Sequence, residues 1–364
     1  MTDHIKLFIP GPVEVRPDIL KAQAAPMIGH RGKPFEALYS RIQEKLRQVF
    51  FTSQRVLLST SSGTGLWEGA ARNCVTDDPA RGVLATVCGA FSARWADVFE
   101  MNGKAVTRIQ VEQGRAIKPE MVREAIAQRP TPFDAIAIVH NETSTGVMNP
   151  LAEIVAVVKE TSPDTLILVD AVSSLAGVKI DFDGLGLDVL LTSSQKCFGL
   201  PPGLAFAAVS DRAMARAKTI RHRGYYFDFL ELEKFLLKNN TPATPAISLM
   251  FALDKQLDDM LAEGLEARFA RHARMAAMTR EWVLSRGFGL FAEAGYESLT
   301  VTCAANTRKA DISAMNKYLA TQGMHISDGY GSLKGATFRI AHMADLTEAD
   351  LTELFAAMDR FLAG

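Results

Sequence analysis

Residues 165–170 read TLILVD, residues 187–191 read LDVLL, and residues 192–203 read TSSQKCFGLPPG. Both apolar runs are short and contain neither proline nor glycine, which is typical of strands buried on both faces of a sheet. The first run ends at Asp170, and the second places Lys196 a few residues beyond its own end. We therefore predict two neighbouring strands that present an acid and an amine at one edge of a sheet.

The same alternation of short apolar runs with helical patterns extends towards the N-terminus. Apolar runs at 55–59, 82–88, 106–111 and 133–140 are each followed by a segment with helical periodicity. Strands that alternate with helices in this way are typical of parallel βαβ units. The predicted fold class is α/β, with helices covering both faces of a mostly parallel central sheet.

The chain is long enough for a large domain and a smaller one. It has 364 residues, of which 48% are hydrophobic, so a sizeable core can form. The proline-containing segment 241–245 interrupts the chain, and a long helical pattern follows, with a bend expected at Gly264. Strand patterns at 297–303 and 336–341 then predict a small C-terminal α/β unit.

Composition argues against several classes of protein. The net charge is −1, and no basic stripe is present of the kind that nucleic-acid binding requires. No apolar run approaches the roughly 20 residues of a membrane span. The four cysteines lack metal-site spacing, and a disulfide framework is not expected in so long a chain. We expect a cytoplasmic protein with reduced thiols that binds neither membrane, nucleic acid nor metal.

Residues 59–65, STSSGTG, connect a predicted strand to a predicted helix. Hydroxyl groups and free backbone N–H groups at a helix N-terminus form an anion site, so this segment is a candidate phosphate-binding loop. An ordinary glycine-rich turn capped by serine and threonine would look the same. The segment is neither a Walker loop nor a GxGxxG fingerprint.

Four polar groups follow strand ends in this pattern: the loop around Ser62, the turn 141–143, Asp170 and Lys196. Ligands of open α/β sheets bind beyond the carboxyl ends of the strands, so these groups are expected to share one site. Taken singly, Asp170 is equally well a helix cap and Lys196 a solvated lysine. Together, an amine for a Schiff base and a carboxylate for a ring nitrogen favour pyridoxal 5′-phosphate (PLP) as cofactor.

At this point the chain resembles the class V aminotransferases among the fold-type I PLP enzymes, and the alanine/serine–glyoxylate (serine–pyruvate) group in particular. The resemblance runs over nearly the whole chain. Its carriers are PGP at 10–12, GHRG at 29–32, SGT at 62–64, NETSTGV at 141–147, VDAVSS at 169–174, SQK at 194–196 and PPG at 201–203.

The resemblance implies a fold, a domain division and an assembly. Residues 21–255 would form the large PLP-binding domain and residues 256–364 the small C-terminal domain. Residues 1–20 would return to pack with the small domain. The protein would be a homodimer with shared active sites. Three residues would reach the phosphate of the partner subunit, namely Asn240, Thr241 and Thr244.

The resemblance also implies residue roles. Lys196 would form the Schiff base and carry the proton, and Asp170 would pair with the ring nitrogen. The other cofactor-binding residues would be Ser62, Gly63, Thr64, Phe91, Thr143 and Gln195. Phe91 stands where the glyoxylate group usually has a tryptophan; it can still stack but donates no hydrogen bond. Simple core packing is the alternative for Phe91.

Arg339 would bind the substrate carboxylate, because a guanidinium can donate two parallel hydrogen bonds to it. The backbone at Gly11 would face the same substrate, and His30 would lie at the rim of the site. Two further basic groups, Arg31 and the cluster Arg221, His222 and Arg223, are either rim residues or plain surface charge.

The predicted activity is PLP-dependent transamination from serine or alanine to glyoxylate or pyruvate. One alternative within this chemistry is a phosphoserine or aspartate aminotransferase that uses 2-oxoglutarate, with the basic rim binding the second anion. Another is a lyase of the cysteine desulfurase type, which needs a cysteine on the loop 327–335; the sequence has none there. A scaffold that has lost catalysis would show damage at Lys196 or Asp170, and both are present.

Overall fold

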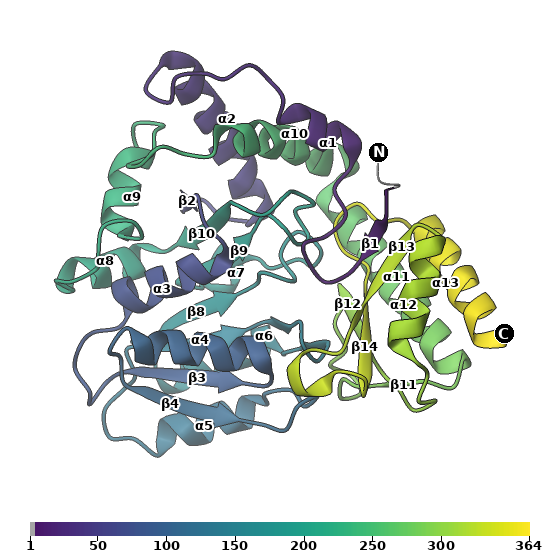
Figure 1. Ribbon diagram of the computed structural model, residues 1–364. Helices are drawn as coiled ribbons and strands as arrows, with labels where there is room; N and C mark the ends of the chain where they lie inside the picture. Colours follow the sequence, from purple (N-terminus) through teal and green to yellow (C-terminus); the bar gives the residue numbers. More distant parts are fainter. Residues whose placement is uncertain (1–3) are drawn as a thin grey trace.

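The computed structural model describes residues 4–364 (Figure 1). Its larger sheet has seven strands in the order β2-β10-β9-β8-β5-β3-β4. The strands are β2 (Arg55–Ser59), β3 (Val83–Val87), β4 (Val106–Gln110), β5 (Ala135–Val139), β8 (Leu166–Asp170), β9 (Val189–Ser193) and β10 (Ala205–Val209). All are parallel except β10, which pairs antiparallel with both β2 and β9. The predicted, mostly parallel α/β sheet is thus confirmed, and β10 is the strand that the pattern did not reveal.

Helices cover both faces of this sheet (Figure 1). They are α1 (Pro17–Ala22), α2 (Lys33–Val49), α3 (Gly63–Cys74), α4 (Ala90–Met101), α5 (Pro119–Ala127), α6 (Leu151–Thr161), α7 (Phe182–Leu185), α8 (Asp211–Thr219), α9 (Phe229–Leu236) and α10 (Ile247–Glu263). Successive side chains of a strand point to opposite faces. In β5, Ile136 and Ile138 join the core under α2, α5, α6 and α10, whereas Ala137 and Val139 join the core under α3, α4, α8 and α9.

A second, five-stranded sheet has the order β1-β13-β14-β12-β11. It comprises β1 (Lys6–Phe8), β11 (Gly289–Leu290), β12 (Val301–Ala305), β13 (Met324–Asp328) and β14 (Thr337–Ala341). Its helices are α11 (Leu265–Ser285), α12 (Ile312–Thr321), the short 3₁₀ helix Gly331–Leu333 and α13 (Glu348–Ala363). Together they enclose a core of their own, which includes Phe8, Trp282 and Phe338.

The N-terminal and central segments connect the two units. Strand β1 pairs in parallel with β13, so the chain starts in the smaller sheet, where Figure 1 shows the purple segment beside the yellow-green strands. The predicted boundary at residue 255 falls inside α10, which packs with α1 and α2. The predicted bend at Gly264 is confirmed: its φ of +84° ends α10 and begins α11, a conformation that glycine adopts without strain.

Two kinds of feature are not found among residues 4–364. No helix there is both long enough and apolar enough to cross a membrane. No group of three or more histidine, cysteine, aspartate or glutamate side chains in that range is placed to hold a metal ion.

Candidate active site

A cavity of about 310 Å³ opens beyond the carboxyl ends of β5, β8 and β9, where ligands of open α/β sheets bind. It is lined by nine residues that were predicted from the sequence: Gly11, Ser62, Gly63, Thr64, Phe91, Thr143, Asp170, Gln195 and Lys196. The fold therefore brings together residues that are up to 185 positions apart in the chain (196 − 11). Trp67, Arg94 and Ser173 also line the cavity, although the sequence did not single them out.

The N-terminus of α3 forms one end of the cavity. Helix α3 begins at Gly63, inside the predicted connecting segment 59–65, and the Ser62 hydroxyl does not cap it, so backbone N–H groups remain available for an anion. A Cβ atom at position 63 would lie 2.7 Å from the Val172 side chain, so a residue larger than glycine would clash there. The hydroxyl of Ser193 is buried near this position and has no hydrogen-bond partner among the described residues. These features fit a phosphate group.

Asp170 stands at the end of β8 with only 4% of its surface exposed. It accepts hydrogen bonds from the Val172 backbone N–H at 2.7 Å and from Trp67 Nε1 at 3.0 Å. Burial raises the pKa of the carboxyl group to about 7, because a charge is poorly solvated in this environment. A cationic ring nitrogen is the partner that would stabilise the charged form, so the Asp170 position fits a protonated pyridine ring.

Replacing Trp67 by phenylalanine should lower the free energy of unfolding by about 1.5–3 kcal/mol, the usual contribution of a hydrogen bond to a charged group. The aromatic stack on Trp95, with ring centroids 6.1 Å apart, would be kept. Denaturant unfolding of the cofactor-free protein measures the loss. Trp282→Phe is the comparison variant: it removes a bond of the same length to Asp359 in the small unit, but Asp359 is partly exposed and also pairs with Arg286, so we expect a smaller loss. A loss of unfolding free energy in Trp67→Phe no larger than that in Trp282→Phe would contradict the expected contribution of the buried bond.

Lys196 lies in the turn after β9, and its Nζ donates to the Pro10 carbonyl oxygen. A Cβ atom on Gly11 would come within 2.7 Å of the same Nζ, and Gly11 has a φ of +120°, so glycine is required here. Burial, followed by the charge of Arg339, lowers the pKa of Lys196 to about 8. An amine with such a pKa is partly uncharged near neutral pH and can accept a proton.

Arg339, on β14, was predicted to bind the substrate but is not among the residues that line this cavity; it is 7% exposed and lies beside the cavity, behind Thr143, where it lines a separate hollow next to α12 and β13. Its guanidinium donates to the Asp328 carbonyl oxygen at 3.2 Å and to the Thr143 carbonyl oxygen at 3.4 Å. Burial lowers the pKa of Arg339 from its ordinary value. No carboxylate among the described residues lies within ion-pair distance of this guanidinium, so its charge is available to an anion.

An aromatic group borders the opening of the cavity. The rings of Phe91 and Tyr330 lie 5.1 Å apart, and the Arg94 guanidinium lies 5.4 Å from the Phe91 ring centre. Arg94 also donates to the Tyr330 hydroxyl at 2.7 Å. Because Phe91 is on α4 and Tyr330 follows β13, this group connects the two units over the site.

Glu142 fixes the position of Phe91; the sequence placed it in the turn 141–143 but predicted no role for it. This fully buried carboxylate lies in the hairpin β6 (Asn141–Glu142) and β7 (Val147–Met148). It accepts hydrogen bonds from the Phe91 and Ser92 backbone N–H groups and from the hydroxyls of Ser92 and Ser144. A carboxylate is thereby bound to the N-terminus of α4, where Gly89 has no side chain to cap the helix.

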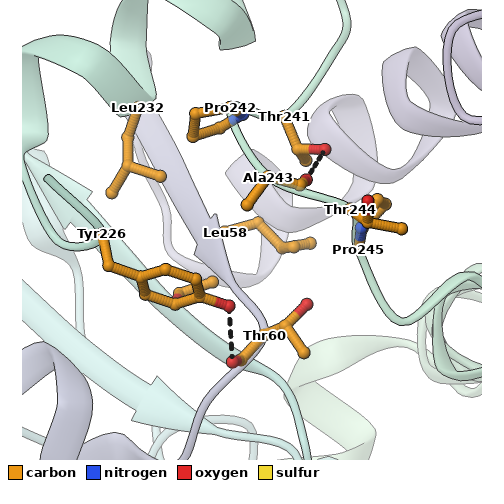
Figure 2. Close-up of a pocket in the computed structure, with 10 residues that line it drawn as sticks. Leu58, Thr60, Tyr226, Leu232, Thr241, Pro242, Ala243, Thr244 and Pro245 are labelled. Carbon is orange, nitrogen blue, oxygen red and sulfur yellow. Dashed lines mark hydrogen bonds between the residues drawn. The ribbon is translucent and has the colours of Figure 1, made fainter.

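The remaining predicted residues do not line this cavity. Asn240, Thr241 and Thr244 lie in a segment that passes Thr60, where Figure 2 shows a separate, smaller hollow. Arg31 is bound to that segment, donating to the Asn240 side chain at 2.5 Å and to the Thr241 carbonyl at 2.6 Å.

The other basic candidates also lie apart from the cavity. His30 is half-buried. Arg221 and His222 are exposed, and Arg223 pairs with Asp228 at 3.0 Å.

The model of the family described as aminotransferase class-V matches residues 19–351. The chain belongs to this family. It is therefore a PLP-dependent transaminase of class V with the fold-type I architecture, as its resemblance to the family predicted.

Individual relatives agree with this assignment. An uncharacterized aminotransferase of Methanocaldococcus jannaschii is 38% identical over 97% of this class V chain and 91% of its own. The L-aspartate–glyoxylate aminotransferase of Paracoccus denitrificans is 33% identical over 96% and 89%. The crystal structure of an alanine–glyoxylate aminotransferase from Nostoc sp. superimposes with a TM-score of 0.91 at 29% identity, covering 99% of this chain and 95% of that one.

Proposed function

We propose that this transaminase moves the amino group of a small amino acid, alanine or serine, to glyoxylate, with pyruvate as a second acceptor. The observation that carries the proposal is that Lys196 and Asp170 line one cavity together with the N-terminal end of α3. Glyoxylate is named in both the Paracoccus and the Nostoc proteins. We propose that the reaction takes place in the cytoplasm, in keeping with the four cysteines, which are buried and unpaired.

The cofactor in this proposal is pyridoxal 5′-phosphate. Backbone N–H groups of α3 with Ser62, Thr64 and Gln195 would hold its phosphate, and Asp170 would hold its ring nitrogen. When bound, this group supplies an electron sink for the carbanion formed at the substrate Cα. The buried Gln195 Oε1 has no hydrogen-bond partner within the described chain, which is consistent with a ligand at this position.

The chain's own residues would bind the substrate and move its proton. Arg339 would bind the α-carboxylate through its guanidinium fork, and the Gly11 backbone would face the substrate from the other side. Lys196 Nζ would take the proton from Cα, a task suited to an amine whose pKa is lowered to about 8 by burial and by Arg339. Phe91 and Tyr330 at the opening would limit the size of the donor side chain.

A second candidate donor is aspartate. The Paracoccus relative is named as an L-aspartate–glyoxylate aminotransferase. Arg94 lines the cavity, and none of the described carboxylates lies within ion-pair distance of it. A desulfurase is disfavoured, because Cys197, next to Lys196, is buried and burial raises the pKa of its thiol to about 11.

We further propose a homodimer with shared sites. Asn240, Thr241 and Thr244 do not line the cavity of their own chain, so they would contact the phosphate of the partner. Sedimentation of the holoenzyme, together with the cofactor dissociation constant of Thr241→Val, tests this. A monomer with full activity would contradict it.

The donor and acceptor are tested by half-reactions of the purified holoenzyme. Alanine, serine, aspartate, phosphoserine and cysteine are each supplied alone, and the released oxo acid or sulfide is measured. We expect alanine or serine to give the highest kcat/KM, and glyoxylate to be the best acceptor. If aspartate instead gave the highest kcat/KM, and if that value fell selectively in Arg94→Gln, aspartate would be established as the donor. Sulfide release from cysteine would overturn both.

A further inference from the structure

Arg268, in the first turns of α11, is a cation buried deep in the protein with 1% of its side chain exposed. Its guanidinium makes four hydrogen bonds of 2.9–3.0 Å. Two of these go to backbone carbonyl oxygens, those of Ala176 and Cys197. The other two go to the carboxylates of Glu263 and Asp345. A charge buried in this way is stable only because it is fully paired.

The two carbonyl groups belong to the two segments that carry the proposed chemistry. Cys197 is the residue after Lys196. Ala176 lies in the turn that follows Asp170, and its φ of +72° is an unfavourable backbone conformation for a residue with a side chain. A single planar guanidinium therefore joins the loop of the acid to the loop of the amine, and it fixes their separation.

The carboxylate partners of Arg268 connect its guanidinium to the small unit. Asp345 follows β14, the strand that carries Arg339, and it also accepts from Gln256 Nε2 at 2.9 Å. A Cβ atom on Gly199 would approach both groups, at 3.0 Å from Gln256 and 3.2 Å from Asp345. The Lys196 turn is thus packed directly against the same network.

Only arginine supplies this set of contacts. Its guanidinium has five N–H donors in a rigid plane, whereas a lysine ammonium is a compact charge without a fork. Neighbouring Arg271 offers a comparison within the protein. It shares Glu263 and donates to the Ala344 and Leu346 carbonyls, but it reaches neither active-site loop.

We propose that Arg268 is a positioning residue for the transamination: it holds the Lys196 turn at a fixed distance from the Asp170 loop and aligns both with the strand of Arg339. This role rests on the proposed function of Lys196 and Asp170. Because it acts through backbone carbonyls, Arg268 contributes to the rate of proton transfer and not to the identity of the substrate.

Arg268→Lys tests the proposal in the holoenzyme. It keeps the positive charge beside Glu263 and Asp345 but cannot serve both carbonyls. We expect kcat to fall about 10- to 100-fold, as misplacement of reacting groups does, with KM for the donor changed much less. We also expect the pH profile of kcat to shift, because Lys196 moves relative to Arg339. Arg271→Lys is the matched control and should keep kcat within about twofold of the wild type.

Thermal unfolding and the PLP dissociation constant are measured on the same samples. A purely structural role predicts a lower Tm in Arg268→Lys, with kcat per bound cofactor and the pH profile unchanged; that result would overturn the proposal. Equal losses of kcat in both arginine variants would also overturn it. Lys196→Ala is assayed in parallel: activity in that variant refutes the proposed function, whereas an inactive Lys196→Ala beside a fully active Arg268→Lys refutes only the role of Arg268.

Discussion

Replacement of Lys196 by alanine is expected to abolish turnover, with kcat falling by about 10⁴-fold or more. Loss of a positioned proton-transfer group alone costs about 10²–10⁴-fold, and the variant also loses its covalent bond to the cofactor. Among residues 4–364 no other lysine lines the cavity, so none of them is placed to substitute. The visible absorption band of the holoenzyme should disappear or shift in the same sample.

Lys218→Ala is a suitable control for this variant. Lys218 is exposed on α8, away from the cavity, and its removal should leave both the spectrum and kcat unchanged. If Lys196→Ala retained the wild-type spectrum and a rate near that of the control, the assignment of the amine would be wrong.

The second large effect is expected for Asp170→Asn, in which kcat should fall about 10²–10³-fold, the usual cost of one preorganised electrostatic contact. The amide is nearly the same size but carries no charge to stabilise a protonated ring nitrogen. Steady-state rates with saturating cofactor measure the loss. Asp188→Asn, at another buried carboxylate beside β9, is a control for general damage to the sheet. Equal losses in both variants would contradict the specific role.

The same substitution should change how the stability of the cofactor-free protein depends on pH. Burial raises the pKa of Asp170 from 3.8 to about 7, so between these values the folded state binds more protons than the unfolded state. The unfolding free energy contributed by this group therefore falls as pH rises through that window, by up to about 4 kcal/mol. Urea unfolding at pH 5 and pH 8 samples only part of this window, so between these two pH values the wild type should lose about 2.6 kcal/mol more than Asp170→Asn does. An identical pH dependence in both would show that Asp170 titrates normally.

Much of the large sheet could be predicted because its strands are short, apolar and bounded by turns. Residues 166–170 and residues 189–193 are both fully buried. Strands buried on both faces have continuous apolar sequences, which are easily recognised. Strand β10, Ala205–Val209, was missed because three of its five residues are alanines, which are depleted in strands, and because it follows a proline–glycine segment. Strand β13 was missed because its sequence, MHISD, combines weak alternation with polar residues.

The site residues whose function depends on a position at the end of a strand could be predicted from the sequence. The residues whose function depends on contacts between distant segments could not. Asp170 and Lys196 follow strands that local pattern locates. Trp67, Glu142 and Arg268 act on segments 103, 51 and 92 positions away, and no local pattern encodes those pairings. Their hydrogen bonds become visible only once the chain is folded.

The amine at position 196 is proposed to hold the cofactor covalently, and reductive trapping tests this bond directly. The holoenzyme is treated with borohydride, which converts a carbon–nitrogen double bond into a stable single bond, and is then digested and analysed by mass spectrometry. The account predicts that the cofactor's mass is found on the peptide containing Lys196 and on no other peptide. Recovery of the cofactor on a different lysine, or release of all of it unbound, would contradict the account.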